Sequence, residues 1–156
     1  MNEKEQLLEQ YSEWIDYVRV LKEQDETLWN QSMGEGKWLV RDVVSHIMKW
    51  DEYFLEGAIL KISRKEELTV KHLDYDSFNE RAKTYGRTMS IQELIEQTLA
   101  YRQNIIDCIK GLSEEEYTKE YVDADEHPFQ VPVFIRDFIW HDQHHMNQIK
   151  SLMNNQ

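Results

Sequence analysis

The sequence predicts an all-α protein, a four-helix bundle, from three observations. Apolar residues recur at spacings of three and four along four long segments, as they do on one face of a helix. Only two prolines and five glycines occur in the 156 residues, and they lie near the apparent ends of these segments. The connections are short or polar, which favours an antiparallel-type bundle. The length is usual for one domain, here expected to span residues 1–156.

The first two helices are predicted from their apolar stripes. The first runs from about Glu3 to about Lys22, and the second follows "MGEGKW" and runs from about Leu39 to Ile62. The stripe of the first helix comprises Leu7, Leu8, Tyr11, Trp14, Ile15, Val18 and Leu21. The seam of the second comprises Leu39, Val43, His46, Trp50, Tyr53, Gly57 and Leu60. A histidine is therefore expected inside a core seam.

The second half of the chain predicts a short helix and two long ones. The short helix is "SFNERAKTYG", after a polar connection. The third long helix opens at Ser90 with the capping-box pattern "SIQE" and closes near Gly111, which suits the left-handed C-cap position. An acidic connection follows, in which Glu114 to Glu116 form a solvated first turn or loop. The last helix runs from about Pro132 to Met153, because proline is favoured in a first turn.

Charge and composition disfavour several classes of function. The 18 Lys and Arg against 30 Asp and Glu give a formal net charge of -12, which disfavours binding to nucleic acid or to an anionic membrane surface. The first residues, "MNEKEQLLEQ", lack the apolar core of a signal peptide, and no stretch is apolar for long enough to span a membrane. Cys108, the single cysteine, cannot form an internal disulfide. We therefore expect a cytoplasmic, soluble protein.

The stretch "HDQHHMNQI" places three histidines within five positions of the last helix. At about 100° per residue, His141 and His145 lie on the same side as Phe134, Phe138, Ile149 and Leu152, whereas His144 points away. The i, i+4 spacing brings the imidazoles of His141 and His145 close enough to bind one divalent ion. Two histidines make a weak site, and His46 is the one other histidine on a predicted core seam. A metal site and a set of hydrogen-bonded core histidines both remain open at this point.

A histidine shortly after "GEGKW", followed by H-x-x-x-H and a nearby glutamine in the last helix, resembles the DinB-like proteins, also called the YfiT or mycothiol-maleylpyruvate isomerase superfamily. The resemblance covers essentially the whole chain. It implies a four-helix bundle, a homodimer, and a metal held by His46, His141 and His145. Characterised relatives use zinc or nickel to activate a low-molecular-weight thiol such as bacillithiol or mycothiol. One departure is Leu39, where the family usually has the helix cap Ser or Thr.

An open site is expected from this ligand set, because structural zinc sites are normally closed by four protein ligands. A divalent cation lowers the pKa of bound water and ionises a coordinated thiol. Imidazole suits several metals, and we favour zinc or nickel. The favoured function is a thiol-dependent transferase of the bacillithiol type acting on a small molecule. A metal-activated hydrolase and a non-catalytic bundle that binds a metal, a small ligand or a helix are the alternatives. The sequence identifies no general base for the hydrolase.

Other polar and aromatic residues have weaker claims to function. Asp142 could orient a bound imidazole, but simple solvation is the expectation for an acid on a helix of an acidic protein. Trp50 and Tyr53 share the face of His46 and could line a cavity, although core packing is the commoner role. The remaining expectations are helix capping or exposure for Asn79, no catalytic role for Cys108, core packing for Trp38 and Trp140, and solvent-exposed loop positions for His72 and His127.

Overall fold

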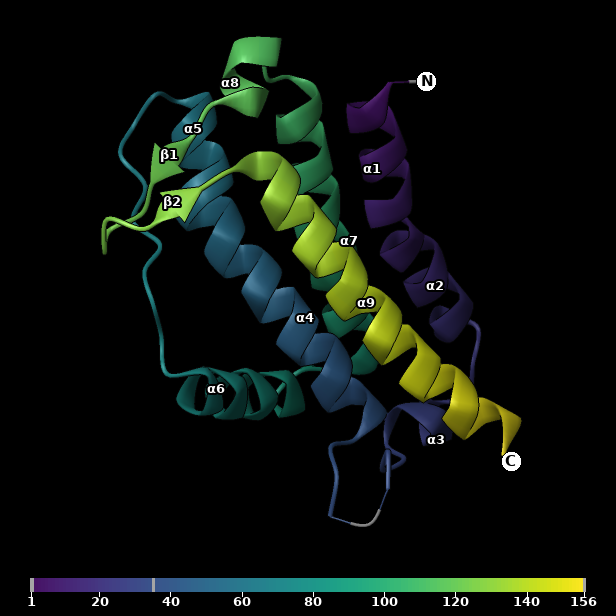
Figure 1. The fold of residues 1–156 in the computed structure, drawn as a ribbon. Coiled ribbons are helices and arrows are strands. Elements are labelled where there is room, and N and C mark those ends of the chain that lie inside the picture. The colour runs from purple at the N-terminus through teal and green to yellow at the C-terminus, as the bar shows by residue number, and fades with distance from the viewer. Residues whose placement is uncertain (1, 35, 156) are drawn as a thin grey trace.

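Four long helical segments form the bundle in the computed structural model, which describes residues 2–34 and 36–155 (Figure 1). The predicted all-α four-helix bundle is confirmed. The four segments are α1 (Glu3–Tyr11) with α2 (Glu13–Lys22); α4 (Val40–Phe54) continued by the π-helix η1 (Leu55–Ile59) and α5 (Leu60–Ser63); α7 (Ile91–Lys110); and α9 (Val131–Asn154). None of the helices in the described part of the chain combines the length and hydropathy that a bilayer crossing requires.

Shorter elements connect the long ones. They are α3 (Glu26–Trp29), α6 (Tyr75–Arg87), α8 (Glu114–Thr118) and an antiparallel pair of strands, β1 (Tyr121–Val122) and β2 (Pro128–Phe129). The sequence predicted α6 only over residues 77–86. It begins earlier because the Asp74 side chain accepts a hydrogen bond from the backbone N–H of Ser77 and caps the helix.

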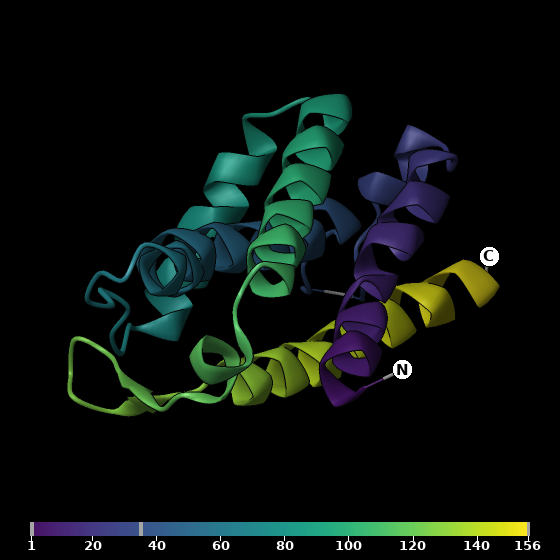
Figure 2. The same cartoon turned by 90° about the horizontal axis from the view of Figure 1, so that it is seen from above.

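The two helices α4 and α9 lie side by side and carry the histidines. In Figure 1, α9 runs between α4 and the α1–α2 segment, and α6 lies across one side of α4. Figure 2 shows the same arrangement from above, with α7 and α9 lying apart from each other and the two chain termini apart. Helix α6 therefore covers the part of α4 that includes His46.

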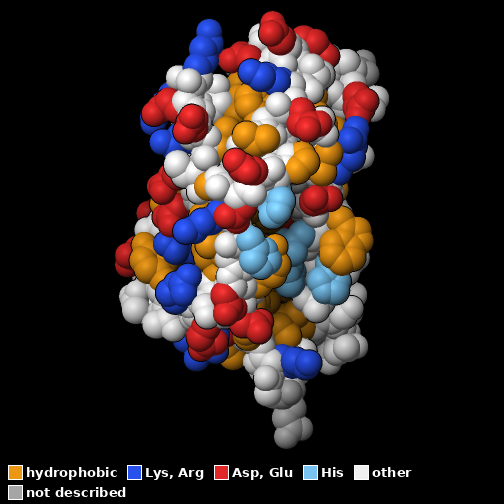
Figure 3. All heavy atoms as spheres, turned by 60° about the vertical axis from the view of Figure 1, so that its left-hand side comes forward, with side chains coloured by type: hydrophobic (Ala, Val, Ile, Leu, Met, Phe, Trp, Pro, Cys, Tyr) orange, Lys and Arg blue, Asp and Glu red, His pale blue; other side chains and the backbone are white. Residues whose placement is uncertain are grey.

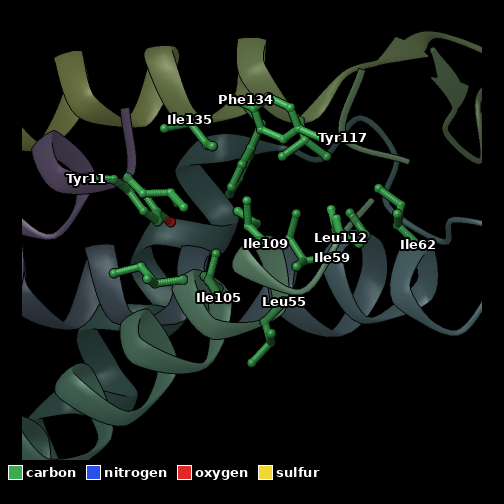
Figure 4. Close-up of a cluster of buried hydrophobic side chains, with 14 of the residues drawn as sticks. Tyr11, Leu55, Ile59, Ile62, Ile105, Ile109, Leu112, Tyr117, Phe134 and Ile135 are labelled. Carbon is green, nitrogen blue, oxygen red and sulfur yellow. The ribbon is translucent and has the colours of Figure 1, made fainter. Parts of the chain in front are cut away.

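The core consists of two clusters of buried apolar side chains. The first lies where α1, η1, α7 and α9 meet and includes Tyr11, Ile59 and Phe134, which Figure 4 labels. The second lies between α2, α3, α4, α7 and α9 and includes Trp14, Trp29 and Met48, all essentially inaccessible to solvent. The apolar stripe predicted for the third long helix is buried as expected: Ile91, Leu94, Thr98, Ile105, Ile109 and Leu112.

Two local predictions were wrong. The first long helix is divided at Ser12, whose hydroxyl donates to the carbonyl of Glu9 and so competes with the helical pattern. Gly111 has a φ of -80° and is not left-handed, because the chain turns directly toward α8 through the Leu112 N–H to Ile109 carbonyl bond. The acidic residues Glu114 to Glu116 form the first turn of α8, one of the two predicted forms, and Ser113 and Glu116 form the capping box that starts this helix.

Candidate metal centre

Three histidine side chains from two helices converge at one point of the bundle. His46 in α4 is 5 % exposed, and His141 and His145 in α9 are partly buried. One potential ligand atom from each lies within 4.8 Å of the other two. The His46 Nε2 to His141 Nε2 distance is 2.9 Å, and the His145 Nε2 to His141 Nε2 distance is 3.3 Å. The structure therefore brings together the three residues that the sequence singled out.

Hydrogen bonds to the outer nitrogens of His46 and His145 decide which nitrogen of each of these two rings is free. The Trp50 indole N–H can only donate, and it donates to Asn79 Oδ1 at 2.9 Å. His46 Nδ1 lies 2.7 Å from the same oxygen, so it must carry the proton that it donates. Gln148 Oε1 lies 2.9 Å from His145 Nδ1 and can hold that ring in the same way. The Nε2 atoms of His46 and His145 then present lone pairs to the centre.

The metal-free arrangement leaves a lone pair without a donor. His141 Nε2 faces the Nε2 atoms of both other rings, but it carries at most one proton. It can donate this proton to the Nε2 atom of His46 or to that of His145, and the Nε2 atom that remains then has no donor. The His141 Nδ1 atom is itself buried without a hydrogen-bond partner among the described residues. A cation at the centre would satisfy all three Nε2 atoms together, which the protein alone does not.

Burial keeps the three rings neutral. Burial, together with repulsion from the neighbouring His145, lowers the pKa of His46 to about 4. It also lowers the pKa of His141 to about 3, with added repulsion from His46 and His145. Burial also lowers the pKa of His145. Neutral imidazole is the form that ligates metals, so the ligands are ready at neutral pH.

The residues present fit a divalent transition metal. Nitrogen-to-zinc bonds of about 2.0–2.1 Å place neighbouring nitrogens of a tetrahedral site roughly 3.3 Å apart, close to the separations found here. Three neutral imidazoles suit zinc, nickel, copper or iron. With three protein ligands, a fourth position would remain for water or a substrate. Occupation of this centre by a metal stays a prediction.

Helix α6 places Asn79 beside His46 because this helix packs unusually close to α4. A Cβ atom at Gly86 would lie 1.7 Å from Ser45 Oγ, so no larger residue fits there without displacing α6. At the end of the same helix, Arg87 donates two hydrogen bonds to the buried carboxylate of Asp42, at 3.0 and 2.7 Å. These contacts fix α6 against the turn of α4 that contains His46.

The start of α4 lacks the usual side-chain cap, as Leu39 in the sequence implied. The carboxylate of Asp42 takes over part of that role and accepts the backbone N–H of Leu39 at 2.9 Å. Helix α4 starts at Val40, one residue after the predicted start, so the absent cap does not move His46.

A second polar cluster also ties α4 to α9. Arg102 in α7 is fully buried and donates to Asp51 in α4 at 2.8 Å and to Asp142 in α9 at 2.7 Å. It also donates to the backbone carbonyl of Tyr11 at 3.0 Å and lies over the ring of Tyr11. Burial raises the pKa of both carboxyls, and the guanidinium opposes that rise. The expectation that Asp142 is solvated was therefore wrong.

A cavity of about 500 Å³ opens beside the histidines, lined by His46, Trp50, Phe54, Tyr75, Asn79, Asp137, Phe138, Trp140 and His141. Its size is usual for a small-molecule site. Figure 3 shows histidine side chains on this side of the molecule, among hydrophobic and acidic ones. The cavity is called the aromatic cavity below.

Of the other residues that the sequence singled out, some lie beside the histidines and others lie away from them. His144 is exposed and stacks on Trp140, away from the centre. Trp50 lines the aromatic cavity, whereas Tyr53 does not and instead bonds to the backbone of Lys71. Trp38 packs against the His46 ring. Cys108 is half-buried at the edge of the first core cluster, and the loop residues His72 and His127 are exposed, as expected.

Sequence reasoning missed three residues of this region. Asn79 was expected to cap a helix or to be exposed, but it holds His46 and Trp50. Trp140 was assigned to the core, but it is 70 % exposed at the cavity. Arg102 lies at a core position of α7. A charged residue within that apolar stripe could have indicated a buried ion pair.

Comparison with known proteins places the chain in a family. The model of the DinB superfamily matches residues 5–149, and the chain belongs to this superfamily. No curated protein sequence matches it significantly.

Two solved structures share the fold. One is YfiT from Bacillus subtilis, described as a probable metal-dependent hydrolase with an unusual four-helix bundle topology. It has a TM-score of 0.74 and 15% identity, over 99% of this chain and 89% of that one. The other is the mycothiol-dependent maleylpyruvate isomerase, with a TM-score of 0.73 and 16% identity over 95% of this chain. The match spans only 61% of the isomerase chain. At such identities the likeness shows the fold alone.

Proposed function

We propose that this protein is a metal-dependent enzyme in which His46, His141 and His145 hold a zinc or nickel ion and a low-molecular-weight thiol reacts with a small-molecule substrate. The observation that carries the proposal is the convergence of three histidine nitrogens at a centre where a lone pair lacks a donor. A bound ion of this kind ionises a coordinated thiol and also acidifies coordinated water.

The protein's own residues prepare and shield such a centre. Asn79 and Gln148 hold the rings of His46 and His145 with Nε2 directed inward, and outer hydrogen bonds of this type raise metal affinity. Burial keeps the rings neutral. The aromatic cavity next to His46 and His141 gives a second reactant a largely apolar place to bind. The described mycothiol dependence of one structural neighbour supports a thiol as the first reactant.

A metal-activated hydrolase is the second candidate, and one residue that lines the cavity favours it. Hydrolysis requires a general base near the attacking water. Asp137 lies one helical turn before His141 and lines the same cavity as His46 and His141, so its carboxylate is available for that role. The description of YfiT as a probable metal-dependent hydrolase also supports this candidate.

The experiment that tests the proposal is thiol binding to cobalt-substituted protein, followed by visible absorption. We expect an intense thiolate-to-cobalt band with a small thiol, and no band in the His141→Ala variant. A cobalt-loaded protein that shows no such band, yet hydrolyses a neutral ester in a manner that requires Asp137, would replace the transferase with the hydrolase. Cobalt binding without either property would favour the non-catalytic bundle.

We also propose a homodimer and a cytoplasmic location, as the family resemblance and the sequence suggest. Light scattering on the purified protein at micromolar concentration should return the dimer mass. A single monomer mass would contradict the dimer.

A further inference from the structure

The walls of the aromatic cavity come from three helices and are almost entirely aromatic. Helix α4 supplies Trp50 and Phe54, α6 supplies Tyr75, and α9 supplies Phe138 and Trp140. Two of the metal-centre histidines, His46 and His141, form its inner end. A molecule that reacts at the centre would therefore place the rest of its structure between aromatic rings.

The inner wall of the cavity is rigid. Trp50 is 7 % exposed, its ring stacks on Phe78 at a centroid distance of 3.9 Å, and its N–H is held by Asn79. A second ring, Phe54, also stacks on Trp50, at a centroid distance of 5.9 Å. Preformed aromatic surfaces lose little conformational entropy on binding, so this wall is suited to a flat ligand.

The opening of the cavity carries aromatic surface that the protein leaves in water. Trp140 and Tyr75 are 70 % and 57 % exposed, and they are two of the three most exposed large hydrophobic side chains in the described part of the chain. His144 stacks parallel to Trp140, with an interplanar angle of 2°, and so supports the ring from outside the cavity. Exposed apolar surface at the edge of a concave site typically marks a ligand-binding surface.

The charges around the cavity oppose an anionic ligand. Asp137 is the only carboxylate among the lining residues, and none of the described residues that line the cavity is a lysine or an arginine. The chain as a whole carries a formal charge of -12. A carboxylate or phosphate inside the cavity would lose water and gain no cationic partner away from the metal centre.

We propose that the aromatic cavity binds a flat, apolar and uncharged group of the substrate, and that Asp137 excludes substrates with a carboxylate at that position. The inference rests on the proposed function, because it assumes that the reacting group of the substrate lies at the histidines. It adds the class of substrate: an aromatic compound without an acidic group on the ring.

Three matched thiols test this specificity on the cobalt-loaded protein. They are ethanethiol, phenylmethanethiol and phenylmethanethiol with a carboxylate para to the thiol arm. We expect phenylmethanethiol to bind about tenfold more tightly than ethanethiol, since its ring leaves water. The carboxylated thiol should bind about tenfold more weakly than phenylmethanethiol.

Two variants assign these effects to the cavity. Trp140→Ala removes an exposed ring and should reduce the advantage of phenylmethanethiol over ethanethiol by about threefold or more. Asp137→Asn should remove most of the discrimination against the carboxylated thiol and leave phenylmethanethiol unchanged. Asp16→Asn, on the exposed face of α2, is the control for loss of a surface negative charge and should change neither ratio.

The outcomes separate this inference from the proposed function. If the thiolate band forms but the three thiols bind equally well, the substrate class is wrong and the metal-dependent function stands. If cobalt or thiols do not bind, the proposed function fails. The cavity is then tested without metal, by calorimetry with phenylmethanol and benzoate. Tighter binding of phenylmethanol, weakened by Trp140→Ala, supports the inference, and no preference overturns it.

Discussion

Two polar clusters join the same pair of helices, α4 and α9, and they differ in whether the protein completes them. In the first, Arg102 lies between the carboxylates of Asp51 and Asp142, and all its contacts are made inside the protein. In the second, His46, His141 and His145 direct their Nε2 atoms at one another with too few protons to satisfy them. The Arg102 cluster is called the closed cluster below, because its charged groups are paired within the protein. The histidine cluster is called the open cluster, because one of its nitrogen lone pairs has no donor unless a ligand binds.

The closed cluster also prepares the open one. Asp51 lies five residues after His46 on α4, and Asp142 directly follows His141 on α9. Because Arg102 binds both carboxylates, it fixes the relative position of the two helices next to the candidate metal centre. The difference teaches that polar residues between two helices can serve stability or ligand binding, and that the count of satisfied hydrogen bonds separates the two roles.

Removal of Arg102 should have the largest effect on stability. The Arg102→Met variant leaves two carboxylates buried without a cation, and breaking a buried ion pair in this way costs about 3–5 kcal/mol. Urea unfolding measures the loss. The triple variant Asp51→Leu, Arg102→Met, Asp142→Leu should regain much of it, and an unaltered stability of Arg102→Met would contradict the closed cluster.

The open cluster predicts a pH dependence of the metal-free protein. The pKa values of His46 and His141 are lowered to about 4 and about 3 in the folded chain, against about 6.5 when unfolded. The unfolded state therefore takes up protons first as the pH falls. Folding stability should decrease from about pH 6.5 to about pH 4.5, by on the order of 2 kcal/mol for each histidine.

Urea unfolding across that pH range measures this loss. The double variant His46→Gln, His141→Gln is the control, because it lacks both titrating groups and shares all others. A double variant that loses stability with acid as steeply as the unaltered protein would show that His46 and His141 are not the cause.

Zinc or nickel should stabilise the unaltered protein. Free metal at about a hundred times its dissociation constant adds about 2.7 kcal/mol, which raises the thermal midpoint. The His145→Ala variant should gain much less, because one ligand is missing. Equal gains in both proteins would mean that the metal binds elsewhere.

Asn79→Leu should weaken metal binding without removing a ligand. The change frees His46 Nδ1 from its acceptor, and loss of such an outer hydrogen bond typically costs about 10–100-fold in affinity. Calorimetric titration gives the affinity. Asn104→Leu, an exposed position on α7, is a control for the substitution itself, and equal affinities of the two variants would contradict the role of Asn79.

Much of this architecture could be predicted from the sequence because the helices are long and their apolar spacing is regular. The i, i+4 pair His141 and His145 depends only on helical geometry, and it was predicted with the correct inward side. Contacts between helices are different. Neither Arg102 with its two carboxylates nor Asn79 with His46 could be predicted, because they depend on which helices meet and in what register.

Local energetics explain the remaining differences. Trp140 is a large aromatic residue of the kind usually found in a core. Its side chain is exposed because this part of α9 lies at the edge of the cavity. The predictions at Ser12 and Gly111 were wrong for two local reasons. A side-chain hydrogen bond of Ser12 interrupts the first helix, and the turn at Leu112 sets the backbone conformation of Gly111. Such choices involve small free energies that a residue pattern does not resolve.

The most direct test of the central claim is zinc titration of metal-free, tag-free protein by calorimetry, together with the single variants His46→Ala, His141→Ala, His145→Ala and His144→Ala. We predict one zinc per chain in the unaltered protein and in His144→Ala, and strongly weakened binding in the other three. Absence of zinc and nickel binding to the unaltered protein, or binding that persists without His46 or His141, would contradict the claim that the open cluster is a metal centre.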